Sequence, residues 1–151
     1  MEREELQSYE KAFLIAEDAV GFAQKLVKEN IKVLKLAQDI ENRILDLGGK
    51  PAWPVNVSIN EIAAHYTPSV GDQLVLKEGD FVKVDIGTQV SGYICDRAFT
   101  VKIGSKSDPM IEASEKALDA CLKLIKPGTK VHEISEVCEN TVNELGFNVV
   151  R

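Results

Sequence analysis

Residues 79–104, GDFVKVDIGTQVSGYICDRAFTVKIG, predict a β-hairpin. Two runs rich in β-branched and aromatic residues flank Val90, Ser91 and Gly92, a combination typical of a turn. With the turn centred between residues 90 and 91, antiparallel pairing places Asp85 directly opposite Asp96. We therefore expect the two carboxylates on one face of the hairpin, with their Cβ atoms about 4.5–5.5 Å apart.

This carboxylate pair predicts a metal site. Two negative charges at such a spacing repel each other unless a cation or a shared proton lies between them. A pair of divalent ions is one natural arrangement, in which one carboxylate chelates an ion and the other bridges both ions.

A structural interpretation of the same residues is also open. In it, Asp85 begins the turn Asp85-Ile86-Gly87, and Asp96 forms a surface ion pair with Arg97. The metal site is favoured because carboxylates among apolar neighbours need partners. The neighbours expected to pack around the pair are Val82, Val84, Ile86, Tyr93, Ile94 and Phe99.

The two histidines receive different interpretations. His65 lies in NEIAAHYTP, residues 60–68, which is expected to form a loop between strand-like runs, where functional groups concentrate. The spacing does not give its position relative to the aspartates. His132 falls on the polar side of a predicted helix, and we interpret it as a structural residue.

A repeat of 98 residues relates two predicted helices, at about residues 32–47 and 130–145, each of which ends at a glycine. Seven residues are identical at this single offset. A repeated unit normally packs against its copy around a shared core. The apolar stripes have the same spacing, with Val33, Leu36, Ile40, Ile44 and Leu47 in the first helix and Val131, Ile134, Cys138, Val142 and Leu145 in the second.

Further helices are expected over about residues 4–28 and 108–125, and the segment PAWPVNVSI, residues 51–59, predicts an edge strand. The fold class is therefore α/β (α+β), with helices packed on an antiparallel sheet. We expect one domain, residues 1–151, in which residues 4–104 form a first repeat. Residues 107–151 would open a second repeat that is cut short, its tail FNVVR beginning a strand.

Composition excludes several classes of protein. The net charge of −6 and the absence of Lys and Arg clusters argue against a nucleic-acid binder. No apolar run is long enough for a membrane span, and a signal-peptide pattern is missing, so we expect a cytoplasmic protein. The three cysteines lack CxxC spacing and are interpreted as reduced thiols.

Several motifs resemble those of the methionine aminopeptidases, particularly the type 2 enzymes of archaea and eukaryotes. The matching strings are GKPAWP (49–54), NEIAAHYTP (60–68), LKEG (76–79), VDIG (84–87) and SGYICD (91–96). The resemblance covers essentially the whole chain. It implies the pita-bread fold, two pseudo-symmetric α/β halves around a metal site, with this chain as the N-terminal half.

By position, the resemblance implies that Asp85 chelates one metal ion and that Asp96 bridges two. His65 resembles the catalytic histidine that contacts the scissile peptide of the substrate. Trp53 stands where the family usually has phenylalanine in the wall of the methionine pocket, a change that would narrow the pocket. The cofactors would be two divalent ions (Co, Mn, Fe or Zn), with one histidine and two glutamates expected from the second half.

The implied function is removal of the initiator methionine from proteins and peptides. The chain alone is expected to be inactive and to need a separately encoded C-terminal half as its partner. A truncated fragment, a non-catalytic pita-bread interaction module and a proline-specific peptidase of the same fold are the alternatives. Retention of both aspartates argues against the interaction module, and the segment NEIAAHYTP favours the methionine enzymes.

Overall fold

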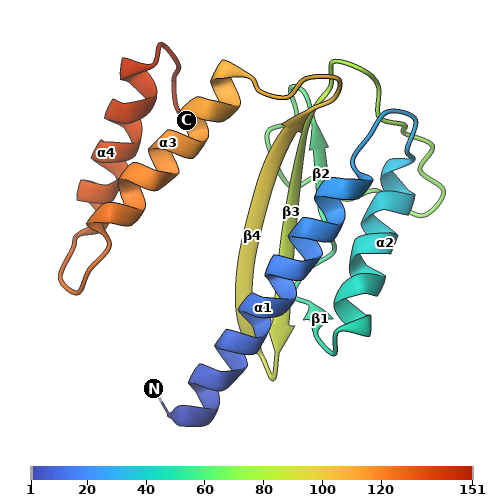
Figure 1. Ribbon diagram of the computed structural model, residues 1–151, viewed down its shortest axis with the longest axis horizontal. Helices are drawn as coiled ribbons and strands as arrows, with labels where there is room; N and C mark the ends of the chain where they lie inside the picture. Colours follow the sequence, from blue (N-terminus) through green and yellow to red (C-terminus); the bar gives the residue numbers. More distant parts are fainter. Residues whose placement is uncertain (1, 151) are drawn as a thin grey trace. The chain divides into compact units, whose positions relative to one another are not determined.

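The computed structural model describes residues 2–150, which divide into two compact units, a first that ends at Ser105 and a second that begins at Lys106. Within these residues the first unit has two helices and an antiparallel sheet, and the second unit has a pair of helices (Figure 1). This combination confirms the predicted fold class. The elements are α1 Arg3–Leu26, α2 Val33–Asp46, β1 Lys50–Pro51, β2 Asn56–Ile59, β3 Phe81–Val90, β4 Tyr93–Lys102, α3 Pro109–Leu124 and α4 Val131–Glu144.

Strand β3 is the centre of the sheet. Strands β1 and β2 both pair with one edge of β3, and β4 pairs with the other edge. The single edge strand predicted over residues 51–59 is therefore two short strands. They are separated near Pro54, which has no N–H to donate to the sheet.

The core of the first unit lies between the helices and one face of this sheet. Because side chains alternate along a strand, Val82, Val84 and Ile86 all point to this face, where they are fully buried. The buried hydroxyl of Thr88 donates a hydrogen bond to the carbonyl of Ala12 at 2.9 Å, which fixes β3 against α1. The other face of β3, with Asp85 among its residues, is left uncovered by these helices.

The 98-residue repeat is visible in the helices themselves. The bounds of α2 and α4 differ by 98 residues at both ends. Each helix is followed by a glycine in the left-handed region, Gly48 with φ 81° and Gly146 with φ 83°. The tail does not begin a strand as expected, since residues 147–150 have no strand conformation and Arg151 lies outside the described residues.

The two apolar stripes differ in burial. Val33 of α2 is 0% exposed, whereas Val131, its equivalent in α4, is 78% exposed. The sheet and α1 cover the stripe of α2. Among the described residues of the second unit, α4 packs against α3 and buries none of its own side chains fully.

This contrast gives a matched pair of stability predictions. Val33→Ala should lower the free energy of unfolding by about 2 kcal/mol, because two buried methyl groups are lost and a cavity remains. Val131→Ala should change it by less than about 0.5 kcal/mol, as expected at an exposed site. Urea unfolding followed by circular dichroism measures both. Equal effects would show that the two stripes are equally buried in solution.

Candidate metal site

The turn of the β3–β4 hairpin sets the register of the two aspartates. Ser91 and Gly92 have φ values of 54° and 87°, as the central residues of a two-residue type I′ turn require. The turn is therefore centred between residues 91 and 92, one residue later than expected. The prediction that Asp85 lies directly opposite Asp96 is wrong.

In the observed register Asp85 pairs with Ala98, and Asp96 pairs with Gly87. Moving the turn centre by one residue shifts the pairing by two residues, so the two aspartates stay on one face of the sheet. They are diagonal neighbours, for which a separation of about 7–8 Å is typical. Two carboxylates at this distance can ligate neighbouring metal ions.

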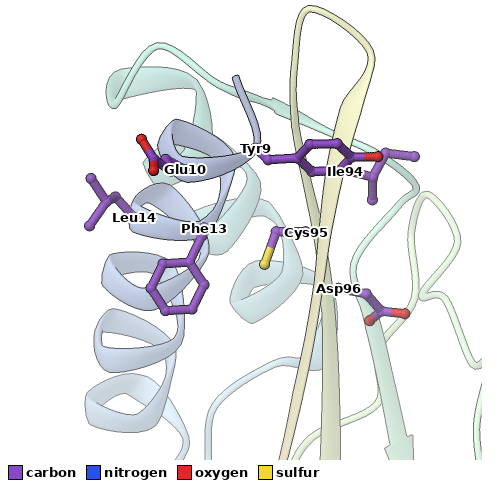
Figure 2. Close-up of a pocket in the computed structure, with 7 residues that line it drawn as sticks. All are labelled: Tyr9, Glu10, Phe13, Leu14, Ile94, Cys95 and Asp96. Atoms are coloured by element: carbon purple, nitrogen blue, oxygen red, sulfur yellow. The ribbon is translucent and has the colours of Figure 1, made fainter. Parts of the chain in front are cut away.

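The face that carries the aspartates is not the core face, so the expected apolar surroundings are wrong. Val82, Val84 and Ile86 alternate away from Asp85 and pack beneath the helices, and Tyr93 donates its hydroxyl to Glu5 of α1 at 3.0 Å. Of the expected neighbours, Ile94 alternates onto the face of Asp96. Figure 2 shows Asp96 projecting from the side of β4 away from α1.

The structural interpretation of the aspartates also fails. Asp85 lies in the middle of β3 rather than at a turn. Arg97 alternates to the helix side of β4, where it forms an ion pair with Glu17 and lies over the ring of Phe13. Arg97 is therefore not available as the partner of Asp96.

Asp85 presents a buried oxygen that needs a partner. Its Oδ1 atom has no hydrogen-bond partner in the structure. Asn56 pairs with Asp85 across the sheet, but its side-chain nitrogen donates hydrogen bonds elsewhere. The acceptors are the Pro54 carbonyl and Thr67 Oγ1, both at 2.8 Å. A buried, unpartnered carboxylate oxygen is costly, and a metal ion is a partner that fits it.

Asp96 carries a related electrostatic cost. Desolvation raises the pKa of its carboxyl above the ordinary range, and the negative charge of Asp85 raises it further. A divalent cation would offset both effects, and carboxylate oxygens are ligands that such ions accept. Among residues 2–150, however, no group of three or more His, Cys, Asp or Glu side chains gathers at one place. The two aspartates are therefore candidate ligands that would need further ligands to complete a metal site.

Trp53 lies on the same face as the aspartates. A Cβ atom added to Gly87 would lie 2.5 Å from the Cε2 and Cζ2 atoms of its indole, so the ring covers the bare Cα of Gly87. The Ala52 N–H also donates to the Gly87 carbonyl at 2.8 Å. Because Gly87 pairs with Asp96, the indole forms an apolar surface beside this carboxylate.

The loop that carries His65 is tied to β2, the strand next to Asp85. The Val57 N–H donates to the Tyr66 carbonyl at 2.8 Å, and the Tyr66 N–H donates to Ser58 Oγ at 3.1 Å. His65 itself is exposed and has a φ of 65°, in the left-handed region. These hydrogen bonds, rather than the sequence spacing, determine where the loop lies against β2.

Asp96 also borders a groove between α1 and β4, which the sequence did not predict. The lining residues are Tyr9, Glu10, Phe13, Leu14, Ile94, Cys95 and Asp96 (Figure 2). The signal in the sequence is the presence of large apolar residues outside the buried stripe of α1. Leu14 is an example, and it is 66% exposed. The groove follows the edge of β4 that has no strand partner among the described residues.

An antiparallel sheet with helices on one face and two aspartates on the other agrees with one half of the pita-bread fold. Residues 7–151 match the pattern of metallopeptidase family M24. The chain belongs to this family.

In residues 2–150 no helix is long and apolar enough to cross a membrane.

Methionine aminopeptidases are among its relatives. The chain is 48% identical over 128 residues to that of Pyrococcus horikoshii, covering 85% of this chain and 43% of the relative. It is 46% identical over 147 residues to that of Thermococcus onnurineus, covering 97% of this chain and 50% of the relative. The chain thus spans about half the length of these relatives.

Solved structures agree with the fold. The methionine aminopeptidase of Thermotoga maritima matches with a TM-score of 0.91 at 26% identity, covering 100% of this chain and 64% of that one. The prolidase of Pyrococcus furiosus matches with a TM-score of 0.82 at 23% identity, covering 96% of this chain and 44% of that one. The second match concerns the fold alone.

The diagonal placement of the aspartates predicts coupled titration. Asp85→Asn should lower the pKa of Asp96, because the amide lacks the charge that opposes ionisation. Carbon NMR of the Asp96 carboxyl across pH measures this in the metal-free chain. Asp119→Asn, which removes an exposed charge in the second unit, is the control. An unchanged Asp96 pKa in Asp85→Asn would show that the two carboxylates do not share a site.

The raised pKa of Asp96 also predicts the sign of a pH effect on stability. A folded-state pKa above the unfolded value favours folding at low pH, and this contribution is lost as pH rises through the folded pKa. Asp96→Asn should therefore stabilise the metal-free chain relative to wild type at neutral pH but not at pH near 3. Thermal unfolding at both pH values measures the difference. Destabilisation at neutral pH would contradict this account.

Proposed function

We propose that this chain supplies the N-terminal half of a methionine aminopeptidase, which removes the initiator methionine from nascent proteins and peptides in the cytoplasm. The observation that carries the proposal is the buried, unpartnered Oδ1 of Asp85, on the same face as Asp96. Identities of 46–48% to archaeal methionine aminopeptidases support the substrate class.

In this proposal Asp85 and Asp96 would be ligands of a pair of divalent ions. When bound, such ions would supply activation of a water molecule and polarisation of the carbonyl of the scissile peptide. His65 contacts the substrate peptide from the loop beside β2, and Trp53 lines the pocket for the methionine side chain. The indole lies against Gly87, where it would narrow this pocket from one side, and Asp96 is exposed beside it.

In this proposal the C-terminal half of the fold completes the site with one histidine and two glutamates. Without it the described residues offer two carboxylates, too few to hold a metal pair in fixed geometry, so the chain alone would be inactive. Exposed apolar side chains are consistent with a surface that the second half of the fold would cover. On the second unit Leu118, Leu122 and Ile125 are each more than half exposed.

Two other functions are less well supported. Asp85 has a buried carboxylate oxygen without a hydrogen-bond donor, and a non-catalytic module has no need for such a group. Two prolidases are 23% and 27% identical to this chain, below the 46–48% identity of the archaeal methionine aminopeptidases.

The direct test is co-expression with the C-terminal half of a related methionine aminopeptidase. The complex should release methionine from Met-initiated peptides only when divalent metal is present. Asp96→Asn should abolish turnover while the complex still assembles, because the amide keeps the shape but loses the charge that ligates the ions. His65→Ala should lower kcat and spare metal binding.

His132→Ala is the matched control for His65→Ala, since His132 is also exposed but lies in the second unit on α4. It should retain wild-type turnover. Near-normal activity of Asp96→Asn in the assembled complex would rule out the carboxylate pair as the metal site.

A further inference from the structure

Asn60 begins the loop that carries His65, and each of its polar groups is hydrogen-bonded. Its N–H donates to the Phe81 carbonyl and its side-chain oxygen accepts from the Phe81 N–H, both at 2.9 Å. Its side-chain nitrogen donates to Asp80 Oδ1 at 2.9 Å, and its carbonyl accepts from Lys83 Nζ at 2.7 Å. The φ of 52° is in the left-handed region that asparagine tolerates. The start of the loop is therefore fixed to the start of β3.

The far end of the loop is fixed independently. Tyr66 exchanges hydrogen bonds with Val57 and Ser58 of β2, and its hydroxyl donates to Asp72. Thr67 accepts from Asn56. Residues 61–65, with His65 at their end, are all exposed between these two anchors. Their position depends on the anchors because they bury little surface of their own.

Lys83 connects this loop to the metal site. It lies two residues before Asp85 on β3, so the two side chains leave the same face of the strand. A hydrogen bond from an ammonium group to a carbonyl is charge-assisted and stronger than one between neutral groups. The strand that carries one carboxylate ligand therefore also holds the loop of the proposed substrate-contacting histidine.

We propose that Lys83 and Asn60 are positioning residues that fix the loop of His65 relative to Asp85. The catalytic part of this proposal rests on the proposed function of His65. Lys83 acts through the Asn60 carbonyl, without contacting substrate. Loss of the Lys83 side chain leaves the other bonds of Asn60 in place, so the sheet should persist while the loop loosens.

The first experiment measures the loop in the full chain without a partner. Lys83→Met should accelerate hydrogen exchange at the Asn60 amide on the order of 10-fold, as loss of a hydrogen bond to a charged group implies. The heteronuclear NOE of residues 61–65 should fall, while exchange at the Val84 amide stays unchanged and reports an intact sheet. Lys83→Arg should restore both values.

Lys77→Met is the control, because Lys77 is exposed and lies just before the same strand. It should behave as wild type. Wild-type exchange and NOE values in Lys83→Met would overturn the proposal. Equal acceleration at Asn60 and Val84 would also overturn it, because Lys83 would then stabilise the whole sheet rather than the loop.

The second experiment uses the complex with a C-terminal half. Lys83→Met should lower kcat on the order of 10-fold with metal affinity unchanged, and should have no further effect in the His65→Ala background. An equal loss in both backgrounds would show that Lys83 acts independently of His65 and would overturn the positioning role. If the wild-type complex releases no methionine, the proposed function fails, and the exchange measurement alone decides whether Lys83 holds the loop.

Discussion

The register of the β3–β4 hairpin depends on two residues with positive φ, Ser91 and Gly92. A two-residue type I′ turn matches the right-handed twist of the flanking strands, and it permits one pairing of the residues on either side. That pairing decides which side chains face the helices and which face outwards. A slip of one residue would move Asp96 and Ile94 to the core side and expose Arg97 and Phe99 instead.

Strand β3 has a buried face that packs in the core and an open face that carries the candidate site. Its buried face holds the core through Val84 and Ile86, and Thr88 fixes it to α1 through the Ala12 carbonyl. Its open face carries Lys83, which donates a hydrogen bond to the Asn60 carbonyl, and Asp85, whose buried oxygen lacks a donor. Gly87 follows on this face, where it lets the Trp53 indole lie against the backbone. A rigid central strand thus fixes the relative positions of these groups.

Periodic features of the sequence predicted much of this structure. The helices and the shared face of the two aspartates follow from spacings of 3.6 and 2.0 residues, which are local properties. The relation between α2 and α4 follows from identical residues at one offset of 98. The predicted partner of Asp85 was wrong because the turn centre depends on backbone torsion angles that composition does not specify. The apolar neighbours were misplaced because closeness in sequence was taken for closeness in space, although alternate residues of a strand face opposite ways. The position of the His65 loop depends on hydrogen bonds from Asn56 and Lys83, side chains outside the loop whose contacts no local periodicity predicts.

The central claim is that Asp85 and Asp96 form one side of a metal site on the open face of the hairpin. Titration of the chain alone with Mn²⁺, followed by paramagnetic broadening of backbone amide signals, tests it most directly. The account predicts weak binding, with a Kd on the order of millimolar as for sites with few protein ligands. Broadening should centre on Asp85, Asp96 and their cross-strand partners, and it should be lost in Asp85→Asn. Tight binding of two ions, or broadening centred elsewhere in the chain, would contradict the account.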